Sequence, residues 1–355
     1  MTNTSYFNKD LEERYPHADD VSERMTAENS FAAGWGMHHK PVPKYIFDNH
    51  IHYNGSKTAS LKQCIKPFAD EWESHNVTRA MILVNMYGIN RDHEVPGYAK
   101  IGSFPWFTVD EITELYGDIK TNEKYFLSAW VDHREPDPDL IRALAGAGFK
   151  GIKLHNAPII ETNAPYDLWL SDEWRKTFNA VDECKLPVLI HVTQRLPCAE
   201  YVGGKRNAYW TTGWENGVTY GNEDLLQTFL KCCELYPNIK FIGAHQLHIG
   251  WERLDKLFSE YPNLYVDLTI GCTLRLYDDF YPHDKEYLRN IFIKHADRLV
   301  FGTDNFWGTR AIKPDNTTLE QHLRFISLLD LPAETLNKVC HGNTELIYGL
   351  EPLVT

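Results

Sequence analysis

Two histidines, His50 and His52, are separated by one residue within an apolar segment of the sequence. In an extended strand, alternate residues point to the same face, so both imidazoles should face the same way, together with Asp48. Two imidazoles on one strand face can bind one ion, although two packed core histidines would give the same pattern. Imidazole and carboxylate groups suit Zn²⁺, with Mn²⁺, Fe²⁺ or Co²⁺ as alternatives.

Other chemically active residues stand at the ends of further apolar segments. These residues are Lys153, His155, His191, His245 and Asp304. A single histidine in an apolar strand is more often a core residue than a ligand. A set of this composition, each member interrupting a hydrophobic segment, is better explained by a metal site with groups that transfer protons.

The elements that must position these residues are eight short apolar segments. They comprise residues 45–52, 79–88, 125–132, 149–155, 187–192, 240–245, 264–269 and 298–304. Amphipathic patterns lie between them at 136–147, 168–184, 222–236 and 284–296. Strands alternating with helices predict a parallel sheet, and eight repeats predict an α/β fold, the (β/α)₈ TIM barrel. The polar residues all fall at carboxyl ends of strands, where such barrels form their active sites.

Two regions lie outside the eight repeats. Residues 1–44 are interpreted as an N-terminal extension, a cover or an oligomer contact, preceding a single barrel domain at 45–355. Residues 193–221 form a loop too long for a simple connection, and its aromatic residues include Tyr209, Trp210 and Trp214. Because this loop follows His191, we expect it to overhang the metal and select the substrate.

Composition excludes several classes of protein. The net charge of −13 is unsuited to a nucleic-acid or membrane-surface binder, although local cations could still bind an anionic small substrate. The seven scattered cysteines form no CxxC pair, which is typical of reduced thiols in the cytoplasm. We also expect no secretory signal and no spanning helix, and a homo-oligomer remains open.

The motifs as a set resemble those of the amidohydrolase superfamily. The matching segments are FDNHIH, GFKGIKLH, LPVLIHV, IKFIGAH, LVFGTD and the final HGNTELIYGL, between about residues 45 and 350. The resemblance is to the amidohydrolase-related (amidohydrolase 2) group, which includes lactonases, hydratases and metal-dependent decarboxylases of aromatic acids.

This resemblance implies roles for particular residues. His50, His52, His191 and Asp304 would bind one divalent metal, most simply Zn²⁺. His245 would be the catalytic histidine that polarises the substrate, and Asp304 would also take a proton from the attacking water. Other members hold two metals bridged by a carboxylated lysine. In that alternative Lys153 is the bridge and His245 binds the second ion.

Several residues are weaker candidates for contact with a small-molecule substrate. They are Lys153, His155, Trp210, Arg275 and Trp307. Lys153, His155, Arg275 and Trp307 lie in or beyond predicted strand ends, and Trp210 lies in the long loop; ordinary packing or solvation is the competing explanation for each. His248 is expected to begin the next helix and not to bind metal.

Two reactions remain open. In the first, a metal-bound hydroxide attacks a lactone or amide carbon, and His245 stabilises the oxyanion. In the second, a non-oxidative decarboxylase or hydratase acts on an aromatic or unsaturated acid, and Asp304 protonates carbon. Both use the same ligands, so ligand spacing does not separate them. A barrel used only for binding is disfavoured because groups for proton transfer are present.

Overall fold

The computed structural model of the 355-residue chain describes its barrel and most connecting helices. The described residues are 43–53, 57, 63, 72–73, 75–89, 104–193, 213, 215–269, 285–307, 319, 322–323, 325–327 and 329–353. The described residues do not include the proposed extension up to residue 42. They also do not include Arg275 or most of the 193–221 loop, with its Tyr209, Trp210 and Trp214.

The described strands form one parallel sheet in which each strand pairs with the next around the barrel. They are β1 (Ile46–Tyr53), β2 (Val77–Met86), β4 (Tyr125–Val131), β5 (Gly151–His155), β6 (Val188–His191), β7 (Phe241–Gly243), β8 (Leu264–Asp267), β9 (Leu299–Val300) and β10 (Asn305–Trp307). A short strand, β3 (Trp106–Phe107), pairs with β2 outside this path. The predicted (β/α)₈ barrel is confirmed.

Residues 299–307, which we call the closing segment, complete the barrel. Its first part, β9, pairs with β8, and its last part, β10, pairs with β1. Between them, the Asn49 amide donates to the Phe301 carbonyl at 3.0 Å and the Asp304 amide donates to the His50 carbonyl at 2.8 Å. A Cβ on Gly302 would lie 3.1 Å from that of His50, so glycine permits this close approach. The predicted eighth strand, 298–304, is therefore a strand only at 299–300, and a further strand follows at 305–307.

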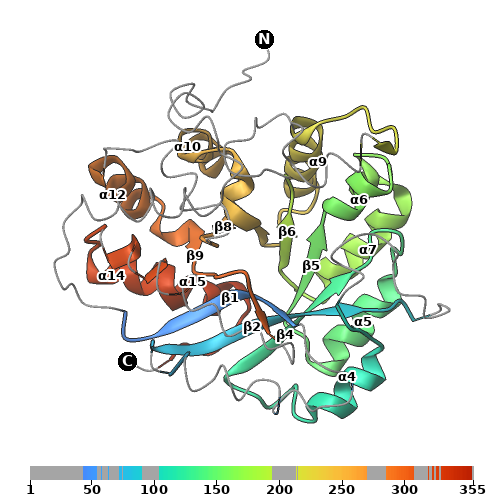
Figure 1. Cartoon of the computed structure of the whole chain (residues 1–355), viewed down its shortest axis with the longest axis horizontal. Helices are drawn as coiled ribbons and strands as arrows, with labels where there is room; N and C mark the ends of the chain where they lie inside the picture. The colour runs from blue at the N-terminus through green and yellow to red at the C-terminus, as the bar shows by residue number, and fades with distance from the viewer. Residues whose placement is uncertain are drawn as a thin grey trace.

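Helices surround the strands on the outside (Figure 1). They are α4 (Val109–Tyr116), α5 (Pro138–Ala147), α6 (Ala157–Glu161), α7 (Asp172–Glu183), α9 (Asn222–Leu235), α10 (Trp251–Glu260), α12 (Lys285–Lys294), α14 (Ala333–Asn337) and α15 (Asn343–Ile347). Shorter helical turns are η2 (Leu168–Leu170), η3 (Ala244–His248), η4 (Ala296–Arg298) and η5 (Lys338–Gly342). All four predicted amphipathic segments contain helices. Within the described ranges, no helix is long and apolar enough to cross a bilayer.

Local sequence explains where α5 begins and ends. The Asp137 side chain accepts hydrogen bonds from the amides of Asp139 and Leu140, and Pro138 occupies the first turn, where no amide proton is needed. The helix ends at Gly148, whose φ of 108° lies in the left-handed region that favours glycine. The intervening apolar residues face the sheet, so capping and periodicity agree on one helix.

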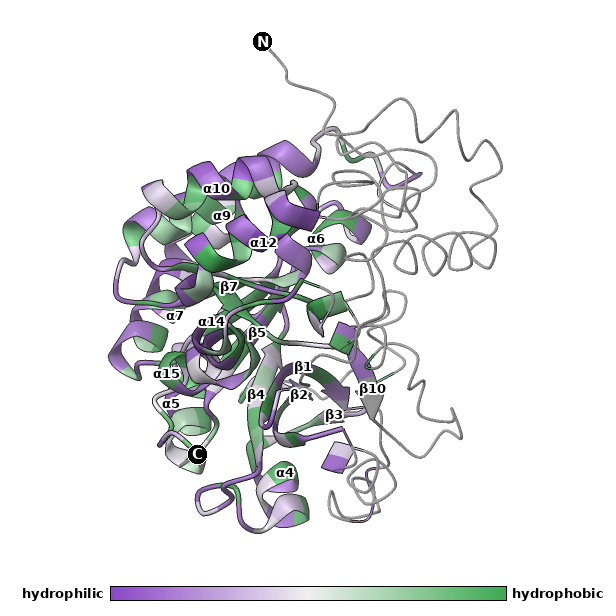
Figure 2. Cartoon of the chain, turned by 90° about the vertical axis from the view of Figure 1, so that its left-hand side faces the viewer, coloured by the Kyte–Doolittle hydropathy of each residue, from purple (hydrophilic) through white to green (hydrophobic). Residues whose placement is uncertain are grey.

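The core has a layer between strands and helices and a second layer inside the barrel. The inner layer takes residues from successive strands, among them Phe47, Met81, Leu189 and Val300. The strands β4 and β7 are mainly hydrophobic, whereas helices such as α9 and α10 mix hydrophobic and hydrophilic residues (Figure 2). Cys232 and Cys233 of α9 are buried in the outer layer.

Simple alternation fails at one place in β1. Simple alternation would put Phe47 and Ile51 on one face, but Phe47 packs inside the barrel and Ile51 packs in the outer layer. The pairing of β1 with β2 shifts register between Asp48 and Ile51, which changes the side that each residue faces. The irregularity lies immediately before His52, at the predicted metal site.

A buried ion pair joins the end of the chain to the barrel. The Arg79 guanidinium of β2 lies 2.8 Å from the Glu345 carboxylate of α15, and both side chains are at most 9% exposed. Arg79 also donates to the Glu351 carbonyl at 2.7 Å, and Glu345 accepts from the Leu353 amide at 3.2 Å. The charges are therefore compensated by hydrogen bonds as well as by each other.

We expect Arg79→Met to lower the free energy of unfolding by about 3–5 kcal/mol, because it leaves the Glu345 carboxylate buried without its partner. Chemical denaturation of the two single variants and of the double variant Arg79→Met/Glu345→Leu would test this. The double variant should lose less than the sum of the single losses. Additive losses would contradict coupling between the two groups.

Candidate metal centre

Three of the predicted ligands converge inside the mouth of the barrel. The Nε2 atoms of His50 and His52 are 3.2 Å apart. One oxygen of Asp304, in the closing segment, lies 3.3 Å from the first nitrogen and 3.1 Å from the second. Both histidines are buried, and the Asp304 side chain is 24% exposed. Three ligand atoms so placed can hold one metal ion.

The closing segment is held to β1 by Asp48. The Asp48 carboxylate accepts hydrogen bonds from the Thr303 amide at 3.0 Å, the Thr303 hydroxyl at 2.6 Å and the His50 amide at 3.2 Å. Burial raises the pKa of Asp48 to about 7, and the bonds from Thr303 counteract that rise. Asp48 shares the predicted face with the two histidines, but its role is to fix the backbone that carries His50 and Asp304.

The state of the His50 ring fits a metal ligand. Burial lowers the pKa of His50, so the ring is neutral and carries one proton. Its Nδ1 lies 2.7 Å from the Asp267 carboxylate, which holds that proton on Nδ1 and leaves a lone pair on Nε2. Burial would raise the pKa of Asp304, but the surrounding imidazoles hold it well below its usual range. The group therefore offers lone pairs and negative charge, as a divalent cation requires.

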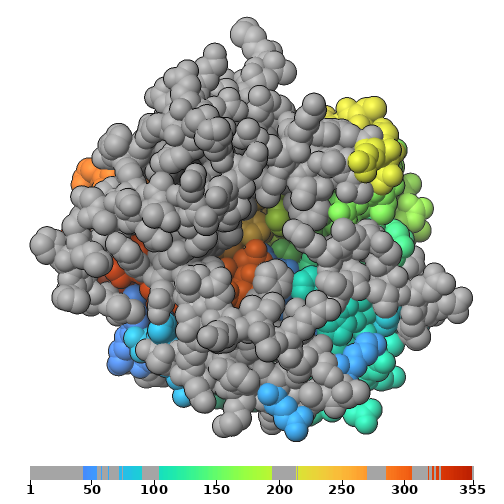
Figure 3. All heavy atoms as spheres, in the orientation of Figure 1, coloured from blue at the N-terminus to red at the C-terminus, as the bar shows by residue number. Residues whose placement is uncertain are grey.

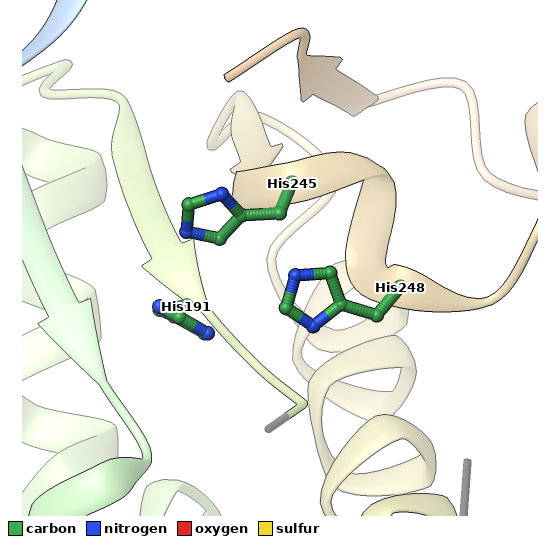
Figure 4. Close-up of side chains that lie close together, drawn as sticks. All are labelled: His191, His245 and His248. Carbon is green, nitrogen blue, oxygen red and sulfur yellow. The ribbon is translucent and has the colours of Figure 1, made fainter. Parts of the chain in front are cut away.

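A second group of imidazoles lies beside the first. Ring nitrogens of His191, His245 and His248 all lie within 4.8 Å of one another. His191 ends β6, while His245 and His248 project from η3 toward it (Figure 4). Nε2 of His191 is buried and has no hydrogen-bond partner among the described residues. The structure thus places three of the four predicted ligands together and His191 in the neighbouring group.

The position of His248 differs from the sequence expectation. It does not begin the following helix, because α10 starts at Trp251, after Gly250. Residues 245–248 instead form a left-handed turn with φ between 50° and 57°. In a turn of about three residues, side chains three apart lie on the same side, so His248 comes to lie beside His245. No periodicity in the sequence signals such a turn.

Lys153 and His155, both on β5, also reach the site. Lys153 Nζ lies 3.3 Å from Nε2 of His50, and burial lowers its pKa to about 8. His155 stacks on Trp130 with ring centroids 5.2 Å apart, and its ring centroid is 4.2 Å from that of His191. Nδ1 of His155 accepts from the Ala157 amide at 2.9 Å, so its proton is on Nε2. His155 is thus a hydrogen-bond donor through Nε2.

Other candidates are placed only in part. Trp307 lies in β10 opposite Tyr53, which supports its position beside the site but says nothing about its side chain. Arg275 and Trp210 lie outside the described residues. In the space-filling view, atoms of the closing segment (orange) are visible near the centre of one face, and the segment that leads into α9 (yellow) lies at its edge (Figure 3).

Sequence reasoning missed Asp267 and Thr269. Asp267 ends β8 and is fully buried, and Thr269 follows two residues later. Burial would raise the pKa of Asp267, but His50 and the His245 amide lower it to about 2. The signal was present in LYVDLT, where an acidic residue interrupts an apolar strand at its carboxyl end. Asp267, like Asp304, is an acidic residue that follows an apolar segment, and this shared feature marks both as candidates.

A barrel with such a site defines a class of metal-dependent enzymes, and comparison with known families agrees. Residues 103–350 match the amidohydrolase family model, and the chain belongs to this family. No curated protein matches the sequence.

Solved structures share the fold at low identity. A probable 2-pyrone-4,6-dicarboxylic acid hydrolase from Acinetobacter baumannii, with citric acid bound, is 12% identical with a TM-score of 0.51, covering 86% of this chain and 99% of that one. A dihydroorotase from Campylobacter jejuni is 17% identical with a TM-score of 0.51, covering 90% and 87%. An uncharacterised TIM-barrel protein from Bordetella bronchiseptica is 14% identical with a TM-score of 0.50, covering 86% and 98%.

We expect elemental analysis of the purified protein to find a divalent transition metal, and His52→Ala to lose most of it, because one of three converging ligands is removed. His295→Ala is a matched control, since that buried histidine bonds Asp255 on α10 instead. Loss of the metal in both variants, or no metal in the wild type after supplementation, would contradict the assignment.

The variant His191→Ala distinguishes one metal site that includes His191 from two separate metal sites. If His191 completes one site with His50, His52 and Asp304, a single ion should be lost. If His191 belongs to a second site, the wild type should hold two ions and the variant one. The ratio of metal to protein decides between these outcomes.

Proposed function

We propose that this protein is a metal-dependent hydrolase that cleaves the C–O or C–N bond of a small lactone or amide. The observation that carries the proposal is the placement of Asp304. One of its oxygens lies within 3.3 Å of Nε2 of both β1 histidines, and the other lies 3.8 Å from Nε2 of His245. A carboxylate so placed can share in metal binding and accept a proton at the same point.

His50, His52 and Asp304 would hold the ion, with His191 as the fourth ligand that the family resemblance implies. When bound, a divalent metal lowers the pKa of a coordinated water and polarises a substrate carbonyl. Asp304 would take a proton from the attacking water. Because the surrounding imidazoles hold its pKa low, Asp304 would keep that proton only briefly. His245, 3.8 Å away, is the next catalytic group in line to receive or pass it.

Two donors on β5 are suited to the substrate oxygen. Lys153 supplies an ammonium group at the centre of the site, and His155 supplies a proton on Nε2. In a buried site, such donors stabilise developing negative charge more strongly than in water. We therefore assign substrate binding to Lys153 and His155, while Trp210, Arg275 and Trp307 remain sequence-based candidates.

A decarboxylase or hydratase acting on an aromatic or unsaturated acid is the second candidate. The observation in its favour is the combination of a buried cation, Lys153, with the stacked rings of Trp130 and His155. A cation beside an aromatic surface suits an aromatic carboxylate. In this reaction Asp304 would deliver a proton to carbon instead of taking one from water.

The two reactions are separated by their products. Metal-loaded protein would be tested with lactones, cyclic amides and hydroxylated aromatic acids in ¹⁸O-labelled water. Hydrolysis places the label in the product carboxylate, whereas decarboxylation releases CO₂ and leaves the organic product without the label. The lactone 2-pyrone-4,6-dicarboxylic acid belongs in the panel because a probable hydrolase of that acid shares the fold. CO₂ release as the sole reaction would replace the first proposal by the second.

We expect His245→Asn to keep its fold and lose roughly 10²- to 10⁴-fold in kcat, because a group that transfers protons is removed. Steady-state kinetics and metal content would be measured together, with His295→Asn as the control. Loss of about half the metal would show that His245 binds a second ion. Unchanged turnover would remove His245 from the mechanism.

A further inference from the structure

The Asp267 carboxylate contacts both groups of histidines. Its Oδ2 lies 2.7 Å from Nδ1 of His50. Its Oδ1 accepts from the backbone amide of His245 at 2.7 Å and from the Thr269 hydroxyl at 2.8 Å. Thr269 and Asp267 are both fully buried, so water does not compete for these bonds. One carboxylate is therefore connected to His50 directly and to His245 through two routes.

The Thr269 hydroxyl determines where His245 carries its proton. Thr269 has one hydroxyl hydrogen, and the ionised Asp267 oxygen can only accept, so that hydrogen points to Asp267. The hydroxyl oxygen lies 2.5 Å from Nδ1 of His245 and must accept there. In the neutral His245 ring the proton is consequently on Nδ1, and Nε2 then has a lone pair.

We propose that Asp267 is a positioning residue that sets the tautomer of His50 directly and of His245 through Thr269. Both rings then direct an Nε2 lone pair toward Asp304, at 3.3 Å and 3.8 Å. A neutral His245 in this tautomer accepts a proton or binds a cation. It does not donate to a substrate oxygen, which changes the oxyanion-stabilising role expected from the sequence and leaves that role to Lys153 and His155.

The backbone near His245 depends on the same residue. His245, Gln246, Leu247 and His248 all have positive φ. The left-handed conformation is unfavourable for residues other than glycine, so the turn needs fixed contacts. The His245 amide bonds the Asp267 side chain, and the Gln246 side chain donates to the Asp267 carbonyl. Asp267 thus holds both the ring and the turn from which it projects.

Asp267→Asn tests the direct connection. An amide nitrogen facing Nδ1 of His50 would donate to it and move the ring proton to Nε2. Ring-¹⁵N-labelled histidine spectra of the metal-free protein report each tautomer, and His50→Asn assigns the His50 signals. We expect the His50 tautomer to change and metal affinity, measured by chelator competition, to fall roughly 10- to 100-fold. Asp255→Asn, which alters the peripheral pair of Asp255 with His295, should change neither.

Thr269→Val tests the connection to His245 alone. Removing the hydroxyl should broaden or shift the His245 ring signals and leave His50 in its original tautomer, while Thr269→Ser should restore the wild-type spectrum. Thr177→Val, at a buried threonine of α7, controls for loss of a core hydroxyl. This variant also keeps the inference testable if Asp267→Asn does not fold.

The inference rests on the proposed function only for its effect on the metal, so the metal-free spectra test it separately. A His50 proton on Nε2 in the wild type, or a His245 proton on Nε2, would overturn it even if the enzyme is active. An unchanged His50 tautomer in a folded Asp267→Asn variant would do the same. Correct tautomers in a protein that binds no metal would instead refute the proposed function and leave the positioning role intact.

Discussion

The closing segment meets β1 through backbone and side-chain hydrogen bonds, and the site exists only where this closure is made. Asp304 donates its amide to the His50 carbonyl, and Asp48 binds both the amide and the hydroxyl of Thr303. β1 and the closing segment are separated by about 250 residues along the chain, yet their candidate ligands must meet within a few ångströms. Barrel closure supplies this proximity at no further entropic cost to the site, because the fold has already fixed the backbone.

Burial is the second constraint, and it explains why so many ionisable groups lie together. Desolvation lowers the pKa values of His50, His191 and Lys153, and it opposes ionisation of the carboxylates beside them. A buried charge is tolerated only when it is paired and hydrogen-bonded. Asp267 meets this condition through the His50 ring, the backbone amide of His245 and the hydroxyl of Thr269. The hydrogen bonds that stabilise the buried charges at the barrel mouth also leave lone pairs of His50 and Asp304 directed at one point.

The fold and the ligands define the family without defining the reaction. Hydrolysis and decarboxylation need the same cation and the same carboxylate, and they differ in what the neighbouring donors contact. In the proposed mechanism those donors are Lys153 and His155 on β5, because the proposed tautomer of His245 makes that ring an acceptor. The chemical difference between the candidate reactions would therefore lie on the β5 side of the candidate metal site.

The sequence by itself determined the strands, their order and the residues at their carboxyl ends. Short apolar segments separated by amphipathic patterns predicted the barrel, and alternation along the first segment predicted that His50 and His52 share one face of β1. These features depend on local periodicity, which a single sequence displays directly. Local periodicity does not predict the register shift in β1, because pairing with β2 decides where the shift occurs.

The tertiary structure decided which polar residues act together. It placed His191 and His248 beside His245, and it connected Asp267 to histidines that are 22 and 217 positions away along the chain. The left-handed turn at 245–248 has no signal in residue type, because none of its residues is glycine. Its conformation is stabilised by hydrogen bonds from outside the turn. Contacts between distant segments set it, and local sequence preferences carry no information about those contacts.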